Sequence, residues 1–271
     1  MSFYGCHFSF DGTPCTEYGL MLYDFGTSGS ENGTLASGIE IVEDRIARRS
    51  TPLHYGTVMN KPLEFNMTFG ADLDAIDRGV YLDRWDLDAI TNWLIGHNTY
   101  KWLEITQPDM ETVRYRCIIT NLQYTSVGKY PWALNCTVQC DSPFAYLFPE
   151  THTYVINGHS EFKFLNKSTC RRYYKPKLII RPAGGGMFSI VNASDDANRA
   201  VTLTLPSGKN NLEIEMDNEN EIIREKSNAI ANLYPYFNFN FFRLKNGNNN
   251  LIVNGTGTLE IQCEFPISIG G

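Results

Sequence analysis

Residues 82–96 read LDRWDLDAITNWLIG, and this stretch decides the fold class because it is the one convincing helix in the sequence. Apolar residues at helical spacing form one stripe: Leu82, Trp85, Ala89, Ile90 and Trp93. Asp83 is a suitable N-cap and Gly96 a suitable stop. The sequence therefore predicts an amphipathic helix from Asp83 to about Ile95, whose apolar stripe packs on another element.

The runs that flank this helix alternate apolar and polar residues, which is typical of half-buried strands. Leu63–Phe69 and Trp132–Cys140 both follow this period. Tyr115–Leu122 is rich in β-forming residues without a clean period, so we expect it to be covered on both faces. One helix laid on antiparallel strands predicts an α+β or mainly-β first domain.

Charge divides the chain of 271 residues unevenly. Residues 1–148 hold 10 Lys and Arg against 18 Asp and Glu, a net charge of −8, whereas residues 149–271 hold 13 against 12, a net charge of +1. Ser142-Pro143 and Phe148-Pro149 supply breaks near this change. We therefore expect two domains, 1–148 and 149–271.

Short apolar runs separated by turn residues fill the second half. The expected strands are Phe162–Leu165, Lys177–Ile180, Met187–Val191, Val201–Leu205, Leu212–Met216, Leu251–Val253 and Leu259–Phe265. Turns are expected at residues 184–186, 207–208, 217–221, 246–247 and 254–255, and Ile222–Leu233 has room for one helical turn. Short strands with turns between them predict a β-sandwich.

Two segments of the first half have little to bury. Residues 26–38 are rich in Gly, Ser and Thr and predict a flexible loop. Glu43–Arg49 is charged, and Pro52 and Pro62 bracket the residues that follow. This pattern fits a solvated arm or an arm that binds a partner, and the residues alone leave both open.

Composition excludes several classes of protein. With 42% hydrophobic and 20% charged residues the chain is neither disordered nor collagen-like. Its net charge of −7 argues against DNA as the main partner, because phosphate binding needs clustered cations. No apolar run approaches the roughly 20 residues of a membrane span, and residues 1–12 lack the features of a signal peptide. We expect a soluble globular protein that is made and folded in the cytosol.

No arrangement of residues indicates catalysis, a cofactor or a metal. The five histidines are scattered, and none shows the spacing of a metal-binding motif. Gly184–Gly186 follows a strand, but no Lys-Ser/Thr comes after it, which argues against a phosphate-binding loop. The seven cysteines lack regular spacing, and Cys136 and Cys140 are too far apart along one strand to bridge, so we expect buried free thiols.

Aromatic residues carry the one candidate binding function of the second half: Tyr173, Tyr174, Tyr234, Tyr236, Phe237, Phe239, Phe241 and Phe242. Exposed rings over a β-sandwich can stack on sugar rings, and Tyr173, Tyr174 and Tyr236 are the candidates for such contacts. Packing in a core or an interface is the commoner use of aromatic residues, and both alternatives stay open.

Short motifs follow one another in a fixed order through most of residues 1–148: Phe8–Gly12, Glu17–Leu22, Lys61–Phe65, Ile90–Leu94 with Tyr100–Leu103, and Cys140–Tyr146, which reads CDSPFAY. In this order they resemble the distal tail proteins of long-tailed bacteriophages. The strand after Lys175-Pro176 and the Gly247-Asn248 turn are similar, more loosely, to the second domain of that family, a galectin-like or carbohydrate-module-like β-sandwich.

The resemblance implies a tail-tube-like β-barrel or sandwich with one helix, and a structural role at the virion tail tip after assembly in the host cytoplasm. In this family six copies form a ring through sheet edges and a projecting arm. The ring docks on the tail tube above and on the tail-associated hub protein below. Position assigns the arm to about 43–62, with Arg45, Arg48 and Arg49 as contacts to another protomer or partner. The second domain either binds host-surface glycans or holds receptor-binding proteins.

A ring of this kind encloses a lumen through which DNA passes without sequence-specific contacts. An acidic lining fits that passage because like charges prevent sticking, and Asp72, Asp74 and Asp77 are the residues of this hypothesis. The leading expectation is thus a homohexameric ring without catalysis, cofactor or membrane insertion. A sugar-binding module in 149–271 is the alternative. A cell-wall glycosidase is a weaker one, because it needs two carboxylates facing each other across a cleft.

Overall fold

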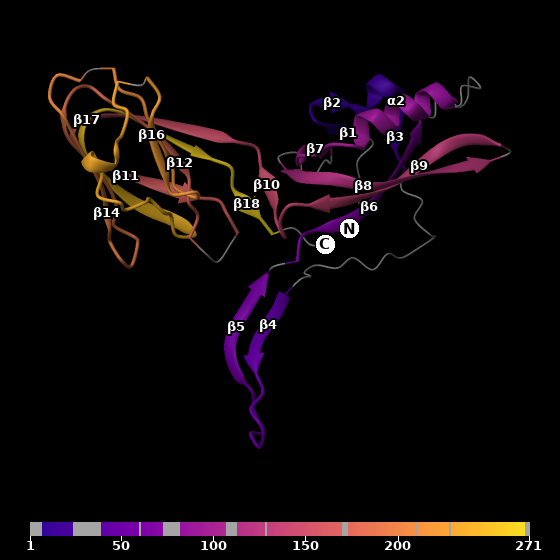
Figure 1. Ribbon diagram of the computed structural model, residues 1–271, viewed down its shortest axis with the longest axis horizontal. Coiled ribbons are helices and arrows are strands. Elements are labelled where there is room, and N and C mark those ends of the chain that lie inside the picture. The colour runs from indigo at the N-terminus through magenta and orange to yellow at the C-terminus, as the bar shows by residue number, and fades with distance from the viewer. Residues whose placement is uncertain are drawn as a thin grey trace. The chain divides into compact units, whose positions relative to one another are not determined.

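Strands make up most of both halves of the protein, as the computed structural model shows (Figure 1). The structure describes residues 7–23, 39–59, 61–72, 82–106, 113–127, 129–169, 173–209, 211–227 and 229–268. The chain divides into two compact units, Met1–Tyr146 with Ser268–Gly271 and Leu147–Ile267. The expected loop at 26–38 lies outside the described residues. The prediction of a mainly-β protein is confirmed, and the described residues contain one α-helix, as expected.

One antiparallel sheet organises the first unit. Its main path runs through β2 (Thr13–Pro14), β1 (His7–Phe10), β7 (Lys101–Thr106), β8 (Val113–Val127), β9 (Tyr130–Cys140), β6 (Glu64–Ala71) and β3 (Leu20–Leu22). The 3-10 turn η1 (Cys15–Tyr18) connects β2 to β3. Two further strands, β4 (Ile39–Asp44) and β5 (Leu53–Met59), form a sheet of their own.

The predicted alternation in β6 and β9 is confirmed. Phe65, Met67 and Phe69 are buried in β6, while Glu64 and Asn66 are exposed. In β9 the side chains from Leu134 to Cys140 alternate in the same way. One face of the sheet therefore supplies the core of this unit, because successive side chains of a strand point to opposite faces.

The expectation that Tyr115–Leu122 is covered on both faces is wrong. Tyr115, Cys117 and Ile119 are buried, whereas Arg116 and Thr120 are exposed, so β8 has one buried face like its neighbours. The period is hidden because the pairing with β9 shifts between Ile119 and Asn121. An extra residue at such a bulge moves the later side chains out of phase.

The predicted helix is present as α2 (Arg84–Leu94), with its N-terminus capped as expected. The Asp83 carboxylate accepts hydrogen bonds from the backbone N–H groups of Trp85 (2.7 Å) and Asp86 (2.9 Å). The Asp86 carboxylate accepts one in return from the Asp83 N–H (2.8 Å). This reciprocal arrangement satisfies backbone donors that the first turn of a helix leaves free.

Trp93 attaches α2 to the sheet. Its ring stacks against Tyr18 (4.6 Å between ring centroids, 15° between planes) and against Phe8 (5.7 Å, 14°). Its indole N–H donates to the Phe10 carbonyl (3.1 Å). Ile90 and Leu94 are buried beside it on the same helix face.

Two members of the predicted apolar stripe do not belong to this buried face. Trp85 is 82% exposed, and Ala89 is exposed as well. Trp85 precedes Ile90 by five residues, which places it about 140° further round the helix and outside the stripe that faces the sheet.

The second unit is a sandwich built around two long strands. β11 (Glu150–Asn166) and β17 (Gly247–Cys263) pair along their whole length. The opposite edge of β17 pairs with β13 (Gly186–Asn192) and with β12 (Lys177–Pro182). β14 (Ala200–Leu205) continues from β13, and β15 (Ile214–Asp217) and β16 (Ile222–Glu225) continue from β12. Apolar side chains from these strands form one buried cluster. The short strands β10 (Ala145–Leu147) and β18 (Pro266–Ile267) pair with each other and are not part of this sheet.

Residues 254–255 are not a turn, and the two strands expected on either side are one strand, β17. Gly255 (φ 138°) and Gly257 (φ 147°) lie inside it. A Cβ on Gly255 would lie 2.6 Å from the Phe188 ring, and one on Gly257 would lie 2.3 Å from the Arg181 carbonyl oxygen. These glycines therefore allow neighbouring strands to approach closely rather than reversing the chain.

The stretch Ile222–Leu233 begins as the strand β16 and not as a helical turn. The 3-10 turn η2 (Tyr234–Tyr236) follows that stretch instead. The expected acidic hairpin tip at 217–221 is confirmed, because β15 and β16 pair on either side of it. There the Asp217 carboxylate accepts a hydrogen bond from the Asn220 N–H (3.0 Å).

Candidate assembly surfaces

Strands β4 and β5 form a two-stranded hairpin (Figure 1), and exposed apolar side chains lie on both of its faces. Ile41 is 60% exposed and lies opposite Thr57, and Val42 is 39% exposed and lies opposite Gly56. Because neighbouring side chains point to opposite faces, each face carries one of them. Tyr55 is 62% exposed as well. A two-stranded hairpin without a hydrophobic cover is marginally stable in water, so this one has the character of an unsatisfied interface.

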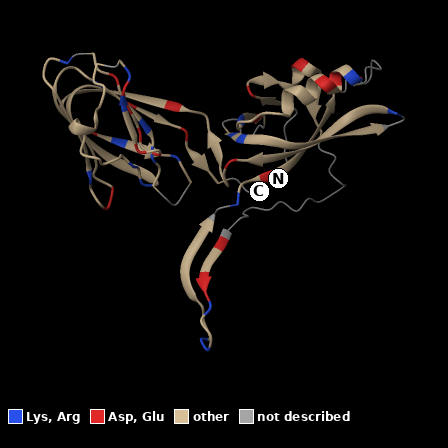
Figure 2. Ribbon diagram, viewed as in Figure 1, with Lys and Arg blue, Asp and Glu red and all other residues tan. Residues whose placement is uncertain are grey.

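The turn of this hairpin brings the three predicted contact residues together. The Arg49 N–H donates to the Ile46 carbonyl (3.2 Å), and Arg48 has a left-handed backbone (φ 70°). The Arg45 side chain is 84% exposed and lies 3.4 Å from the Glu43 carboxylate. Basic residues thus gather at the tip (Figure 2), beside the exposed Ile46. Such a tip can bind carboxylates and stack on aromatic rings.

Trp85 on α2 is a second exposed apolar feature of the first unit, although its spacing in the sequence predicts that it packs on another element with the rest of the stripe. An exposed Trp is a common anchor in protein interfaces. Of the three acidic residues proposed to line a lumen, Asp72 is half-buried, and Asp74 and Asp77 lie outside the described residues.

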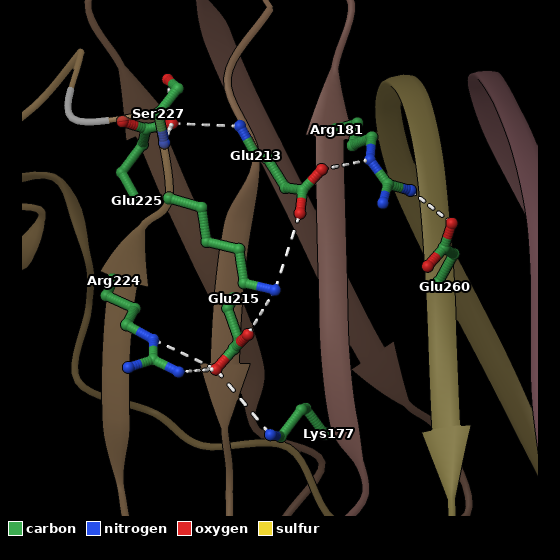
Figure 3. Close-up of polar contacts among 9 residues, drawn as sticks. Lys177, Arg181, Glu213, Glu215, Arg224, Glu225, Ser227 and Glu260 are labelled. Atoms are coloured by element: carbon green, nitrogen blue, oxygen red, sulfur yellow. Dashed lines mark hydrogen bonds and ion pairs between the residues drawn. The ribbon is translucent and has the colours of Figure 1, made fainter.

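A ladder of alternating charges crosses β17, β12, β15 and β16 of the second unit (Figure 3). Arg181 contacts Glu260 and, at 2.8 Å, Glu213. Lys226 lies 3.6 Å from Glu213 and 2.7 Å from Glu215. Arg224 and Lys177 complete the shell around Glu215, whose side chain is 6% exposed.

These contacts set the protonation state of the buried carboxylates. Burial alone would raise the pKa of Glu215, but hydrogen bonds from Lys226 and Arg224 outweigh it and hold that pKa below its ordinary value. Glu225 behaves alike: burial opposes ionisation, yet bonds from the Ser227 hydroxyl and from several backbone N–H groups lower its pKa to about 2. Because the cations already have carboxylate partners, this ladder is suited to stabilising the sheet rather than to binding a charged ligand.

The tyrosines expected to stack on sugars are engaged within the second unit. The Tyr174 ring packs on Phe265 (4.9 Å), and its hydroxyl oxygen accepts a hydrogen bond from the Glu264 N–H (2.8 Å). The Arg243 guanidinium lies 3.9 Å from the centre of the Tyr173 ring. Tyr236 is half-buried in η2. Sugar stacking by these three residues stays a prediction.

Two other rings from the same aromatic group are more exposed. Tyr234 is 39% and Phe239 is 63% exposed, and the rings stack with centroids 5.7 Å apart and planes at 15°. In the sequence these two residues are not distinguished from the other aromatic residues of the segment. The two asparagines that flank Phe239, Asn238 and Asn240, are a sequence signal for irregular backbone at this position, because asparagine is common in turns.

The described residues contain no group of three His, Cys, Asp or Glu side chains that could hold a metal ion. Cys15, Cys117, Cys136, Cys140 and Cys263 are free and buried, as predicted. Burial raises the pKa of Cys136 and of Cys140 to about 12, so both thiols stay protonated at neutral pH and are poor nucleophiles. In the described part of the chain, no helix is long and apolar enough to span a membrane.

Family models match both halves of the chain. The model described as phage tail protein N-terminal domain matches residues 3–142, and the one described as phage tail C-terminal domain matches residues 144–263. The chain therefore belongs to this family of phage tail proteins, and it is a structural component of a phage tail.

Solved structures identify the fold more narrowly. The Dit protein (gp 19.1) of phage SPP1, described as a paradigm of the hub adsorption apparatus of phages that infect Gram-positive bacteria, aligns with a TM-score of 0.64. The identity is 13%, over 96% of this chain and 98% of that one. The fold is thus that of a Dit protein. A chain of the phage P2 baseplate in its activated conformation with Ca is less similar (TM-score 0.47, 12% identity, 94% and 97% covered). A search of curated proteins finds no match.

Proposed function

We propose that six copies of this protein form a ring at the distal end of a phage tail, where the ring joins the tail tube to the tail-associated hub protein. Membership of the phage tail family and the Dit fold support this role. The protein contributes architecture, and the proposed function contains no catalytic step. Assembly takes place in the host cytoplasm.

The β4–β5 hairpin carries the proposal. Ile41, Val42 and Tyr55 are exposed on strands that pair only with each other among the described residues. Covering such side chains stabilises an assembly by roughly 25 cal/mol per Å² of apolar surface. The hairpin acts as the arm of the ring, seated on a neighbouring protomer.

Ring closure follows from this kind of contact. An arm that binds a different surface of the next copy makes a heterologous interface, which closes into a ring when the rotation between copies is suitable. Arg45, Arg48 and Arg49 then contact the neighbouring protomer or a tail partner at the far end of the arm. The acidic first domain lines the lumen and lets DNA slide through it.

Native mass spectrometry tests the proposal directly. The full chain at about micromolar concentration should give the mass of a hexamer, as expected for an interface of at least standard size. Purified tail tube protein, added to it, should give a larger complex. A chain that stays monomeric and also fails to bind tail tube protein would contradict the proposal.

A further inference from the structure

Three strands of the second unit, β14, β16 and β11, each have an edge with which no other described strand pairs. β16 has only four residues, which limits pairing with another chain. The edge of β14 is occupied, because the side-chain amides of Asn238 and Asn240 both donate to the Ala200 carbonyl oxygen, at 2.8 and 2.9 Å. The Thr202 N–H donates to the Asn238 side-chain oxygen as well (3.1 Å). β11, with 17 residues, therefore has the long open edge of this unit.

This open edge of β11 is divided by a sharp bend. The rings of Tyr154 and Phe162 stack with their centroids 3.9 Å apart. Eight residues of straight strand would span about 27 Å, so the chain bends between them, where Gly158 has a φ of 83°. Before the bend β11 lies beside the part of β17 that pairs with β12, and after it beside the part that pairs with β13. The segment after the bend, residues 159–165, has charges of both signs on its exposed face.

Every second residue of this segment points its backbone groups away from β17. The Ala193 N–H donates to the Asn250 carbonyl (2.8 Å), so the backbone groups of Asn250 face β13. Lys163 lies opposite Asn250 in the β11–β17 ladder. A pair of this kind exchanges no hydrogen bonds, so the N–H and C=O of Lys163 point to the open edge. The same alternation turns three further residues outward, namely His159, Glu161 and Leu165.

The charges on this edge are complementary to a second copy of the same edge. A lysine on an edge strand usually prevents pairing, and Lys163 has that position. If a second β11 lies antiparallel with Phe162 opposite Phe162, however, each Lys163 meets the Glu161 of the other copy. Two-fold symmetry forms this pair twice, and opposite charges directly across a ladder are stabilising. Glu161 contacts His159 (3.0 Å), but its side chain stays 66% exposed and accessible to a second cation.

Neighbouring registers do not have this complementarity. Centring the pair on residue 161 places Glu161 opposite Glu161, and centring it on residue 163 places Lys163 opposite Lys163, both of which are destabilising. A shift of the partner by a single residue would bring outward backbone groups opposite inward ones, so no ladder would form. The register centred on Phe162 also sets Leu165, which is 51% exposed, opposite His159 of the other copy.

We infer that residues 159–165 of β11 are an interface between two copies of this chain, whose open edges pair antiparallel about Phe162 and join the sheets of the two second units. The contact is two-fold, so it differs from the heterologous contact of the proposed ring and does not depend on it. Added to rings, it would link one ring to another. The segment is short, and the contact is smaller than a standard interface, so it forms at high protein concentration.

Sedimentation velocity of the full chain from about 10 to 500 µM tests the interface. Ile41→Ser with Tyr55→Ser serves as the parent, because it removes the arm contacts of the proposed ring. The parent should change from monomer to dimer within this range. Lys163→Glu should raise the dimer Kd about tenfold, since it places like charges opposite each other twice. Glu161→Lys should do the same, and the two substitutions together should restore the parent Kd.

Two controls accompany this exchange of charges. Arg199→Glu makes the same change in charge at another exposed position of the unit and should leave the Kd unchanged. All variants should melt at the parent temperature, because the substituted side chains are exposed. The inference is overturned if the parent forms no dimer at about 500 µM, if the single reversals leave the Kd unchanged, or if the double variant dimerises as weakly as either single variant. A parent that still forms rings is read in the same way, as two linked rings against one.

Discussion

The Arg243 guanidinium holds the Asp195 carboxylate through two hydrogen bonds of 2.8 Å, one to each carboxylate oxygen. The Asp195 side chain is 5% exposed. The Arg243 bonds lower the pKa of Asp195 to about 2 against the opposing effect of burial. Two parallel bonds of this kind make a strong and geometrically specific ion pair.

We predict that this pair makes the second unit acid-sensitive. A carboxyl group whose pKa is lower in the folded state stabilises the fold above its unfolded pKa, and this contribution is lost as the pH falls through the folded value. For Asp195 the window runs from about pH 4 down to about pH 2, and the contribution at neutral pH is about 2 kcal/mol. Thermal unfolding should show that Asp195→Asn is less stable than the wild type at neutral pH. Its stability should also decrease less than that of the wild type as the pH falls across this range.

Asp196 is the matched control for this experiment. It is adjacent in the sequence and 79% exposed, and it pairs with Lys245 at the surface. Asp196→Asn should leave the free energy of unfolding almost unchanged, because exposed ion pairs contribute little to stability. If both variants lost the same amount of stability, the acid sensitivity of the unit could not be assigned to Asp195.

Glu215 should be the most sensitive carboxylate of the charge ladder. Glu215→Gln leaves Arg224, Lys226 and Lys177 without their shared buried partner, so we expect a loss of roughly 1–3 kcal/mol in urea unfolding. Glu221→Gln changes a side chain that is 62% exposed and should have almost no effect.

Two tryptophans on one helix provide an internal comparison. Trp93 is buried between Tyr18 and Phe8, so Trp93→Ala should cost about 3–5 kcal/mol of stability. Trp85 is 82% exposed, and Trp85→Ala should leave the stability of the isolated chain unchanged. Loss of assembly in Trp85→Ala with normal folding would place α2 in an interface. A large loss of stability in that variant would contradict its exposed position.

A comparison of two glycines, one in β17 and one in β11, distinguishes the effect of close packing from that of backbone strain. Gly257→Ala places a Cβ 2.3 Å from the Arg181 carbonyl oxygen, a backbone atom, so we expect a loss above about 3 kcal/mol or failure to fold. Gly158 also has a positive φ of 83° but meets nothing within 4 Å. Gly158→Ala should therefore cost only about 1 kcal/mol in denaturant unfolding, and similar losses in both variants would refute the close-approach argument.

Some of these features could be predicted from the sequence and others could not. Periodicity identified the strand Leu63–Phe69 and the helix, because one buried face leaves a regular pattern of apolar residues. It missed the bulge near Thr120 and the continuity of β17 through Gly255, since both depend on a neighbouring strand. Trp85 was assigned to the core because a stripe drawn by spacing is wider than the face that meets the sheet.

The candidate surfaces could also be predicted in part from the sequence. The family resemblance assigned the predicted arm to about 43–62 by position, and the β4–β5 hairpin of the structure spans Ile39–Met59. Aromatic composition does not predict the exposure of Tyr234 and Phe239, because it does not say which rings lie beneath others, and the asparagines beside Phe239 indicate irregular backbone only. Only the hydrogen bonds of Asn238 and Asn240 show that the loop is built to expose one of them.

The β4–β5 hairpin, the proposed arm, offers two kinds of contact, and their response to salt distinguishes them. Apolar contacts through Ile41 and Tyr55 persist or strengthen at high salt, whereas ion pairs of Arg45, Arg48 and Arg49 weaken once the Debye length falls to about 3 Å at 1 M salt. Exposed ion pairs contribute little, so we expect the apolar faces to dominate. The proposed ring should therefore survive 1 M NaCl in light-scattering measurements.

Variants complete this prediction. Ile41→Ser with Tyr55→Ser should dissociate the proposed ring at every salt concentration, because both substitutions remove exposed apolar surface that the proposed contact would cover. Arg45→Glu with Arg48→Glu and Arg49→Glu should weaken it mainly at low salt. Substituting Lys129, Arg199 and Lys209, which are exposed elsewhere, by Glu gives the same change in net charge and should leave the ring intact. If salt alone dissociated the wild-type ring, the ion pairs of the arginines at the tip, and not the apolar faces, would be the main contacts that hold the protomers together.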